Sequence, residues 1–597
     1  MSGGRFTALD ADKLRGGYYT SGELAAWLAS WAVRSRDDAV LEPSCGDGVF
    51  LEAAAARLRL LGASARAIGE RLAGIEILAV EADRARTRLR RQLGLRGAIV
   101  ETGDFFAWWR RPARRSFDVA IGNPPFIRYQ SFPEPHRGLA MTIMAQLGLV
   151  PNRLTNVWVP FVAAAAASLR PGGRAALVLP AELLQVSYAS QLRSFLTDRF
   201  ASIDVVACNE LFFDRAEQEV VLLLADGCVR EPSAANECRV TLTAARTVAQ
   251  ITARPPADVL AGALPKTVRH DDEKWLKYFL TQREIAFLRE LRTAPSIATL
   301  KAHASVDVGV VTGKNAFFVL SEDQVARLGI GGHTVPAISR CAHLKGACLA
   351  SAEWRGLAAA GDRVHLLHLG PLNGSRPSPR LASYLRRGKA SGIHRGYKCS
   401  IRVPWYAVPS VWVADAFVFR QIYDFPRVVL NEAGATSTDT IHRLRSKVAP
   451  GLLVSNVYTH LTAASAEIEG RSYGGGVLEL EPTEAERLLV PAELGAALPL
   501  AECDRLIRAG RLDQVLAAND GLLLRGQLGL SRADCAMLRA IWIKMRDRRL
   551  ARRRRGCRPP GPPGPPAPPR TPDADAAEDA NAANDAEAAE AADDAEP

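Results

Sequence analysis

The stretch VLEPSCGDGVFL, residues 40–51, decides the fold. A short apolar run ends in the acidic residue Glu42, a turn with Gly46 and Gly48 follows, and the next residues favour a helix. Glycines at a strand end let the backbone approach a ligand closely. Open α/β sheets bind cofactors at this carboxyl edge. The stretch therefore predicts the first strand, turn and helix of a ligand-binding α/β domain.

Short apolar runs alternate with helical stretches on both sides of this segment, from Ala39 to about Gly227. The runs are DAVLEP, IEILAVEAD, GAIVETGDFF, FDVAIGNPP, RAALVLP, SIDVVAC and EVVLLLADG. Such alternation is typical of βαβ units. We therefore predict an α/β fold, with a Rossmann-like parallel sheet that carries helices on both faces.

The pattern changes further along the chain. The stretch ARPPAD breaks the alternation, and an amphipathic helix is expected from Asp271 to Arg292. Short, turn-rich strands follow, then helices over 492–550, and then a basic, proline-rich and acidic tail. We predict an α/β domain over 1–255, a linker helix over 256–299, a mixed, β-rich domain with C-terminal helices over 300–550, and a disordered tail over 551–597.

The charge distribution points to a polyanionic partner. The segment from Thr571 to Pro597 holds ten acidic residues and no Lys or Arg, so the net charge of +12 becomes +22 over residues 1–570. Lys and Arg supply most of the sequence-independent affinity for nucleic acids. A solvated, arginine-rich surface without a nucleic acid partner is the other explanation. Hydrophobic residues at 48% and charged residues at 23% exclude a wholly disordered, collagen-like or coiled-coil chain.

The cysteines and the apolar runs indicate the cellular compartment of the protein. Ten cysteines without a CxxC pair predict reduced thiols and a cytoplasmic protein. The cluster Cys341, His343 and Cys348 lacks paired zinc-ligand spacing, so we expect no metal. The N-terminus lacks an apolar signal region, and the longest nearly apolar run, Val157 to Leu169, is shorter than a spanning helix needs. We therefore expect no membrane association.

Two further strand ends carry residues that suit a nucleotide. The run ILAVEADRAR predicts that Glu81 ends the second strand, where it can accept hydrogen bonds from ribose hydroxyls. ETGDFF places Asp104 and Phe105 after the third strand, a carboxylate for an adenine amine and a ring to stack on it. Each signal alone is also explained by ordinary turn chemistry. Their order predicts a cofactor that contains adenosine.

The next strand end indicates the class of reaction. FDVAIGNPPFIRYQ places Asn123, Pro124, Pro125 and Phe126 after a predicted strand. The prolines remove backbone donors and leave carbonyl acceptors, while Asn123 adds a side-chain oxygen and Phe126 an aromatic face. Two acceptors that bind both N–H groups of an exocyclic amine can draw it toward a nucleophilic geometry. The segment therefore predicts a site for a planar, aminated base.

Six segments in this order resemble the gamma group of N6-adenine DNA methyltransferases, the Taq-like modification enzymes. They are GGYYTSGELAAWL, EPSCGDGVF, AVEAD, GDFF, NPPF and LFFDRAEQEVVLLLA, within the first 225 residues. The resemblance implies an S-adenosylmethionine-dependent catalytic domain followed by a target recognition domain for double-stranded DNA. It also implies a separately encoded cognate restriction endonuclease. We expect a monomer.

The resemblance also implies roles for individual residues. Asn123 and the Pro124 carbonyl would bind the target amine beside Pro125, Phe126 would stack on a flipped-out base, and Phe213 would pack against its opposite face. The cofactor site would comprise Tyr19, Thr20, Glu42, Pro43, Gly46, Gly48, Glu81, Asp104 and Phe105. Base flipping is required because the amine is inaccessible inside a duplex.

The second half resembles larger members of the same family. DVGVVTGKNAFFVL, YKCSIRVPWYAVP and VVLNEAGATSTD supply candidates for DNA contact, namely Lys314, Arg402, Trp405, Tyr406 and Asn431. The two aromatic residues can equally belong to the core, and Asn431 can be a turn former. The closing helices resemble Xho- or Sal-like enzymes, which suggests a TCGA-containing site.

These observations favour a site-specific DNA adenine N6-methyltransferase. The alternative is an N-methyltransferase for RNA or protein glutamine, because NPP-aromatic motifs also serve those substrates, although those chains are usually shorter. A non-catalytic DNA-binding module is disfavoured because the cofactor turn and the NPPF segment are intact. A fused nuclease is not expected, because about fifteen residues precede GGYYT and no nuclease constellation is found.

Overall fold

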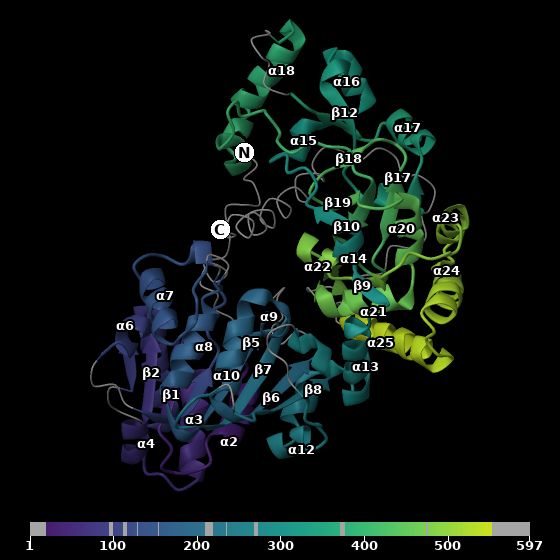
Figure 1. Ribbon diagram of the computed structural model, residues 1–597. Coiled ribbons are helices and arrows are strands. Elements are labelled where there is room, and N and C mark those ends of the chain that lie inside the picture. The colour runs from purple at the N-terminus through teal and green to yellow at the C-terminus, as the bar shows by residue number, and fades with distance from the viewer. Residues whose placement is uncertain are drawn as a thin grey trace. The chain divides into compact units, whose positions relative to one another are not determined.

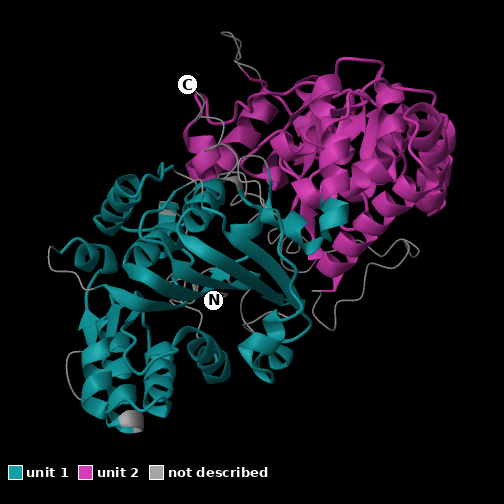
Figure 2. Cartoon of the chain, turned by 60° about the horizontal axis from the view of Figure 1, so that its bottom comes forward, with its two compact units in different colours: residues 1–285, 473–475 teal, residues 286–472, 476–597 magenta. Residues whose placement is uncertain are grey.

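The computed structural model describes residues 20–94, 99–111, 116–127, 129–152, 155–208, 219–233, 236–267, 273–369, 377–472 and 476–551. The chain divides into two compact units, residues 1–285 with 473–475 and residues 286–472 with 476–597 (Figure 2). The division falls within the 256–299 range that the sequence assigned to a linker. There the structure has the short 3-10 helix η3 (Trp275–Phe279) and helix α13 (Gln282–Thr293).

The first unit is built on one large sheet (Figure 1). Over its described residues, the strand order is β3-β2-β1-β4-β5-β7-β6-β8. The bounds are β1 (Val40–Glu42), β2 (Leu72–Glu76), β3 (Val100–Thr102), β4 (Phe117–Gly122), β5 (Leu169–Pro180), β6 (Phe200–Cys208), β7 (Val220–Cys228) and β8 (Arg239–Ala245). The predicted α/β fold is confirmed. One expectation differs, because β7 runs antiparallel to both of its neighbours.

Helices pack on this sheet in two groups. Helix α3 contacts both α2 and α5, and α6, α7 and α8 contact one another. The chain crosses from β3 to β4 over the other face of the sheet, because the strand order reverses there. The bounds are α2 (Gly22–Ala32), α3 (Val49–Leu60), α4 (Ala65–Arg71), α5 (Ala79–Leu93), α6 (Phe105–Trp109), α7 (His136–Gln146), α8 (Trp158–Ala167), α9 (Glu182–Gln185), α10 (Ser190–Thr197), α11 (Val248–Thr252) and α12 (Pro256–Leu260).

The second strand corrects one prediction. We expected the run IEILAVEAD to form a strand that ends at Glu81, but β2 ends at Glu76 and α5 begins at Ala79. The buried residues Ala82, Ala85 and Leu89 recur at helical spacing. This periodicity places the second half of the apolar run in a helix. Glu81 therefore lies in the first turn of α5, beyond the strand end.

The second unit combines small sheets with helices. Its described strands form sheets ordered β10-β19-β15-β17-β13, β11-β14-β12-β18, β16-β21-β20 and β22-β9. Their bounds are β9 (Ile297–Thr299), β10 (Ala304–Asp307), β11 (Val319–Leu320), β12 (Thr334–Ile338), β13 (Cys348–Leu349), β14 (His365–Leu367), β15 (Ala416–Phe419), β16 (Gln421–Ile422), β17 (Val428–Asn431), β18 (Thr436–Ser437), β19 (Ile441–Ser446), β20 (Arg471–Ser472), β21 (Leu478–Glu479) and β22 (Leu489–Pro491). The mixed, β-rich second domain is thus confirmed.

Helices connect and flank these sheets. Their bounds are α14 (Leu300–His303), α15 (Asn315–Phe318), α16 (Glu322–Leu328), α17 (Ser351–Ala359), α18 (Pro379–Ala390), η6 (Ile393–Arg395), α19 (Tyr397–Ser400), α20 (Pro450–Val457), α21 (His460–Glu469), α22 (Pro482–Glu486), α23 (Leu500–Arg508), α24 (Leu512–Asn519), the π-helix η8 (Asp520–Gln527) and α25 (Arg532–Leu550). The predicted C-terminal helices are α23 to α25.

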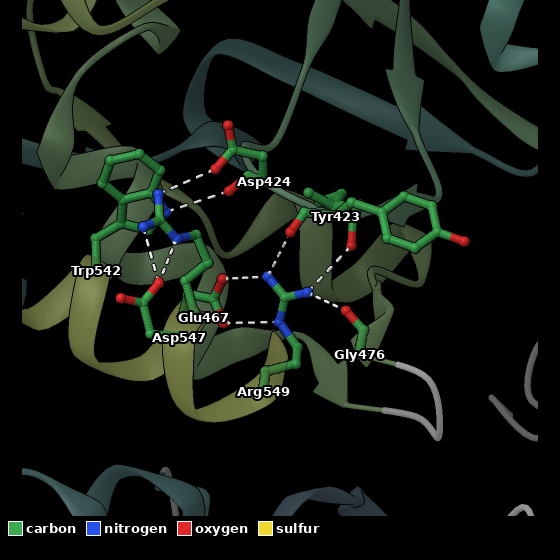
Figure 3. A network of polar contacts seen from close by, with 9 residues as sticks. Tyr423, Asp424, Glu467, Gly476, Trp542, Asp547 and Arg549 are labelled. Carbon is green, nitrogen blue, oxygen red and sulfur yellow. Dashed lines mark hydrogen bonds and ion pairs between the residues drawn. The ribbon is translucent and has the colours of Figure 1, made fainter. Parts of the chain in front are cut away.

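A buried arginine fastens the last helix (Figure 3). Arg549 of α25 is 1% exposed and donates to both carboxylate oxygens of Glu467, at 2.6 and 3.1 Å. Its remaining donors bind backbone carbonyls, among them those of Tyr423 and Gly476. A buried charge is tolerated only when it is paired and fully hydrogen-bonded. This network therefore holds α25 against α21.

Candidate active site

The strand order brings two sequence-distant loops together. Strand β1 pairs with β2 on one side and with β4 on the other, and all three strands are parallel. Strands β2 and β3 are added on one side of β1 and β4 on the other, so the strand order changes direction between β1 and β4. Open α/β sheets bind ligands at such a point, outside the carboxyl ends of the strands. The loops that follow β1 and β4 contain GDG and NPPF. The two motifs thus share one edge of the sheet.

Hydrogen bonds join these loops directly. The Ser44 hydroxyl donates to the Asn123 carbonyl at 3.3 Å. The Asn123 amide donates to the Thr20 hydroxyl at 3.5 Å, and Thr20 is buried. Residues from the segment before α2, from the loop after β1 and from the loop after β4 therefore meet at Asn123.

The glycines of the first loop have different roles. Gly46 and Gly48 both have positive φ, 51° and 85°, which L side chains rarely adopt. A Cβ at Gly48 would lie 2.9 Å from the Cβ of Ala85, whereas a Cβ at Gly46 meets nothing within 4 Å. Gly48 therefore allows α3 and α5 to pack closely. Gly46 leaves open space at the sheet edge.

Two residues that precede these glycines, Glu42 and Pro43, are buried in the protein. Glu42 is 1% exposed and accepts from the backbone N–H of Leu51 at 3.1 Å, near the start of α3. Burial raises the pKa of Glu42 well above its usual range. Pro43 is also buried. Both residues were predicted to belong to the cofactor site, which stays a prediction, and Glu42 also anchors the helix that follows the loop.

Glu76 occupies the place predicted for Glu81. One Glu76 oxygen accepts from the Gly46 N–H and the other from the Leu78 N–H, both at 2.9 Å. Burial raises the pKa of Glu76 despite these bonds. Glu81 instead pairs with Arg84 at 2.7 Å. The acidic residue at the carboxyl end of β2 is therefore Glu76. It was missed because the apolar residues ILAV continue after it, up to Glu81.

The residue after Glu76 adds an apolar surface. Ile77 is 48% exposed, and it directly follows the strand end. An exposed aliphatic side chain beside a buried carboxylate suits a ligand that presents a flat apolar face next to hydroxyl groups. Ile77 was not predicted as a site residue, because the sequence placed it inside the strand and the strand ends at Glu76.

The third strand end departs from its predicted geometry. Asp104 caps α6 by accepting from the Ala107 N–H at 2.7 Å, and its second oxygen lies 2.9 Å from Nδ1 of His136. The Phe105 ring is 2% exposed and stacks against Phe161, with 5.2 Å between centroids. The expected stacking of Phe105 on a cofactor ring stays a prediction. The ring packs in the core below the site.

The NPPF segment follows β4 and lies beside the loop that follows β1. Gly122, the last residue of β4, would place a Cβ 3.3 Å from the Cγ of Glu42. Pro124 and Phe126 are buried, while Asn123 and Pro125 are half-buried. The Val157 N–H donates to the Ile127 carbonyl at 2.9 Å and fixes the exit of the segment. The segment is thus held rigidly beside the first loop.

Arg402 and Asn431, two predicted DNA contacts in the second unit, have structural partners. Arg402 donates to the carbonyls of Val311 and Thr312, at 2.6 and 2.9 Å. The Asn431 amide donates to the carbonyls of Ala414 and Ala435, both at 2.7 Å. Arg402 therefore braces a loop, and Asn431 stabilises a turn.

The aromatic candidates belong mainly to the core. Trp405 lies 5.6 Å from Phe317 between ring centroids, and Tyr406 packs against the same cluster. Lys314 is half-buried and precedes α15. The core interpretation of Trp405 and Tyr406, left open by the sequence, is the one that their contacts favour.

Some predictions fall outside the described residues. Tyr19 and Phe213 lie there, as does the basic run that begins at Arg552. Among the described residues, no group of three His, Cys, Asp or Glu side chains is arranged to hold a metal ion. Within the same part of the chain, no helix is both long and apolar enough to span a bilayer.

Comparison with known proteins identifies the family. The model for the Eco57I restriction-modification methylase matches residues 76–212, and that for the C-terminal domain of the Type II methyltransferase M.Eco57I matches residues 272–524. M.AccI of Acinetobacter calcoaceticus, a Type II methyltransferase, is 21% identical over 79% of this chain and 84% of its own. M.XamI of Xanthomonas campestris pv. amaranthicola is 25% identical over 80% and 85%. The chain belongs to the type II methyltransferases of restriction-modification systems.

Proposed function

We propose that the protein is a site-specific DNA adenine N6-methyltransferase that uses S-adenosylmethionine. One observation carries the proposal: Asn123 of the NPPF segment is hydrogen-bonded to Ser44 in the loop after β1 and to Thr20. A cofactor turn and an amine-binding segment thereby share one edge of the sheet. The proposed product is host DNA that a separately encoded, cognate restriction endonuclease does not cleave.

The residues present fit the cofactor. The Glu76 carboxylate interacts with the backbone N–H groups of Gly46, Leu78 and Ile77, and a carboxylate has about four acceptor sites, so acceptor capacity remains for a ribose hydroxyl. The exposed side chain of Ile77 supplies an apolar face for the adenine. Asp104 lies at the neighbouring strand end, and Gly46 leaves room for the ligand at the loop. Tyr19 and Thr20 would line the methionine end.

The proposed chemistry relies on positioning. The cofactor supplies a methyl group bonded to a positively charged sulfur. The side-chain oxygen of Asn123 and the Pro124 carbonyl accept the two N–H bonds of the target amine and direct its nitrogen toward that methyl carbon. With the cofactor bound, an N–C bond would form as the C–S bond breaks, and the amine would then lose a proton to solvent. Preorganised acceptors act where positive charge develops on the nitrogen.

The target base must leave the duplex to reach these acceptors. Phe126 lies three residues after Asn123 in the same rigid segment, and we assign it to stacking on the extruded base. Unstacking costs a few kcal/mol, and an aromatic face recovers part of it. Phe213 would pack on the opposite face. The second unit would read the surrounding sequence.

A comparison of substrates tests the proposal. Purified protein is incubated with tritiated S-adenosylmethionine and plasmid DNA, total RNA or a glutamine-containing protein extract. We expect label in DNA alone, as N6-methyladenine after nucleoside digestion, and no label with Asn123→Ala. Label in RNA or protein, with none in DNA, would favour the alternative N-methyltransferase function. Cofactor binding by Asn123→Ala is the control that its fold is intact.

A further inference from the structure

One long stretch of the second unit contains no acidic residue. Between Asp362 and Asp415 the chain carries nine Lys or Arg side chains and no Asp or Glu. The whole chain has 64 acidic residues, so about one in ten is acidic and 52 consecutive residues would ordinarily include several. The absence of carboxylates over this length favours contact with a polyanion, because any carboxylate there would repel phosphates.

The structure exposes much of this charge on adjoining elements. Helix α18 ends beside η6, and η6 contacts α19. Four basic side chains on these elements are exposed: Arg386, Arg387, Lys389 and Arg395. We call this set the basic edge. Cations at a helix C-terminus also stabilise the helix dipole, but that effect explains only the first three.

Apolar side chains project next to the basic edge. Val403 is 98% exposed, Ile401 is 59% exposed and Tyr397 is 58% exposed. Single exposed apolar residues are ordinary, but three within seven positions, beside a basic surface, are not explained by packing. We call Ile401 and Val403 the apolar prong.

Two arginines hold the prong in place. Arg402, between the two prong residues, donates to the carbonyls of Val311 and Thr312. Arg443 is 2% exposed and donates to the Ser410 carbonyl on one side and to the Val308 carbonyl on the other. Each guanidinium therefore ties the 401–410 loop to the 308–312 segment. The prong projects from a braced base, so little conformational freedom is lost when it is buried by a partner.

We propose that the basic edge binds the phosphate backbone of duplex DNA and that the apolar prong inserts against the bases of the adjoining groove. This proposal rests on the proposed function and assigns the DNA-contacting surface of its second unit. Apolar wedges flanked by Lys and Arg distort the duplex in proteins that bend or unstack DNA. Arg402 and Trp405 then support this surface from within.

The charge of the basic edge is tested by salt dependence. Binding of the full chain to a fluorescent 40-base-pair duplex is measured by anisotropy over a range of salt for R386A/R387A/K389A. Each phosphate contact contributes about 0.9 to the slope of log affinity against log salt. Three lost contacts should lower the slope by about 2.7 and the affinity at 0.15 M salt roughly 100-fold. The control R36A/R66A/R90A removes three exposed arginines from the amino edge of the first unit and should change neither quantity.

The prong needs a separate variant that leaves the charge unchanged. In I401S/V403S we expect kcat/KM for plasmid DNA to fall roughly 100-fold or more, because each buried aliphatic side chain contributes about tenfold or more to binding. The salt slope and the affinity for S-adenosylmethionine should stay as in the unmodified protein. Leu60→Ser is the control, since Leu60 is 77% exposed in the first unit.

The outcomes separate this proposal from the proposed function. If the unmodified protein methylates plasmid DNA and both variants do so equally well, the surface assignment is wrong and the function stands. If the variants show the expected changes in DNA binding but the unmodified protein transfers no methyl group, the surface assignment stands and the function is wrong. If the variants lose binding to phosphatidylserine vesicles while keeping DNA affinity, the surface faces a membrane and the proposal is overturned.

Discussion

Replacing Glu76 and Glu81 in turn tests the placement of the cofactor ribose. Glu76 ends β2 and its carboxylate keeps acceptor capacity, whereas Glu81 lies in α5 and pairs with Arg84. In Glu76→Gln, the amide retains one neutral acceptor where the carboxylate offers two charged ones. Hydrogen bonds to a charged group contribute about 1.5–3 kcal/mol each, so the loss of one corresponds to a roughly 10- to 150-fold weaker affinity for S-adenosylmethionine.

Glu81→Gln removes a pair whose arginine side chain is 60% exposed. Pairs of this kind contribute about 0–1 kcal/mol, and the cofactor affinity should change less than about twofold. Isothermal titration with S-adenosylmethionine and S-adenosylhomocysteine measures both variants, and thermal unfolding checks that each is folded. A large loss of affinity in Glu81→Gln, with Glu76→Gln unaffected, would refute the placement.

Three further predictions concern stability. Burial lowers the pKa of His442 to about 4. Between pH 6.5 and pH 4 the imidazole is therefore neutral in the folded protein, whereas in the unfolded chain it binds a proton. Stability is therefore present above pH 6.5 and falls by about 3 kcal/mol as the pH drops toward 4; urea unfolding of His442→Gln should show a shallower pH dependence. Gly48→Ala should destabilise by about 2–5 kcal/mol, from the left-handed backbone and the contact with Ala85, whereas Gly62→Ala, with φ +96° and nothing within 4 Å, should lose only about 1–2 kcal/mol. Arg549→Leu should cost about 3–5 kcal/mol by leaving Glu467 buried and unpaired, and R549L/E467L should recover part of that loss in the same assay.

The sequence predicted the site best at residues that tolerate only one backbone conformation, namely the glycine turn after β1 and the prolines after β4. An apolar run followed by a glycine turn and a helix placed the loop after β1 correctly, because positive φ at Gly46 and Gly48 requires glycine. The NPPF segment was placed at the end of β4 for a similar reason, since its prolines end the strand. Hydrophobic periodicity was therefore sufficient for the α/β fold.

The second strand shows where periodicity fails. Apart from Glu76, the run IEILAV is apolar across both the end of β2 and the start of α5, and a short apolar run fits a strand or a helix equally well. The choice between Glu76 and Glu81 depended on that boundary. The antiparallel direction of β7 was missed because alternating apolar runs carry no information on strand direction.

The second unit shows a different limit. A sequence lists the donors of Arg402 and Asn431 but not the carbonyls that they meet after folding. Arg402 donates to carbonyls about 90 residues away, whereas Asn431 donates to those of Ala414 and Ala435, so residue type alone suggested DNA contacts for side chains that bond to backbone. Ile401 and Val403 lie in YKCSIRVPWYAVP, the segment from which the sequence suggested Arg402, Trp405 and Tyr406, but only the structure shows that these two aliphatic side chains are the exposed ones.

The most direct test of the central claim is modification mapping by sequencing. Genomic DNA is taken from a methylation-free host that expresses the full chain, and from a second culture that expresses Asn123→Ala. We predict N6-methyladenine at one short sequence motif throughout the first genome and none in the second. A genome without modified adenine, from cells that contain folded protein able to bind S-adenosylmethionine, would contradict the proposed function.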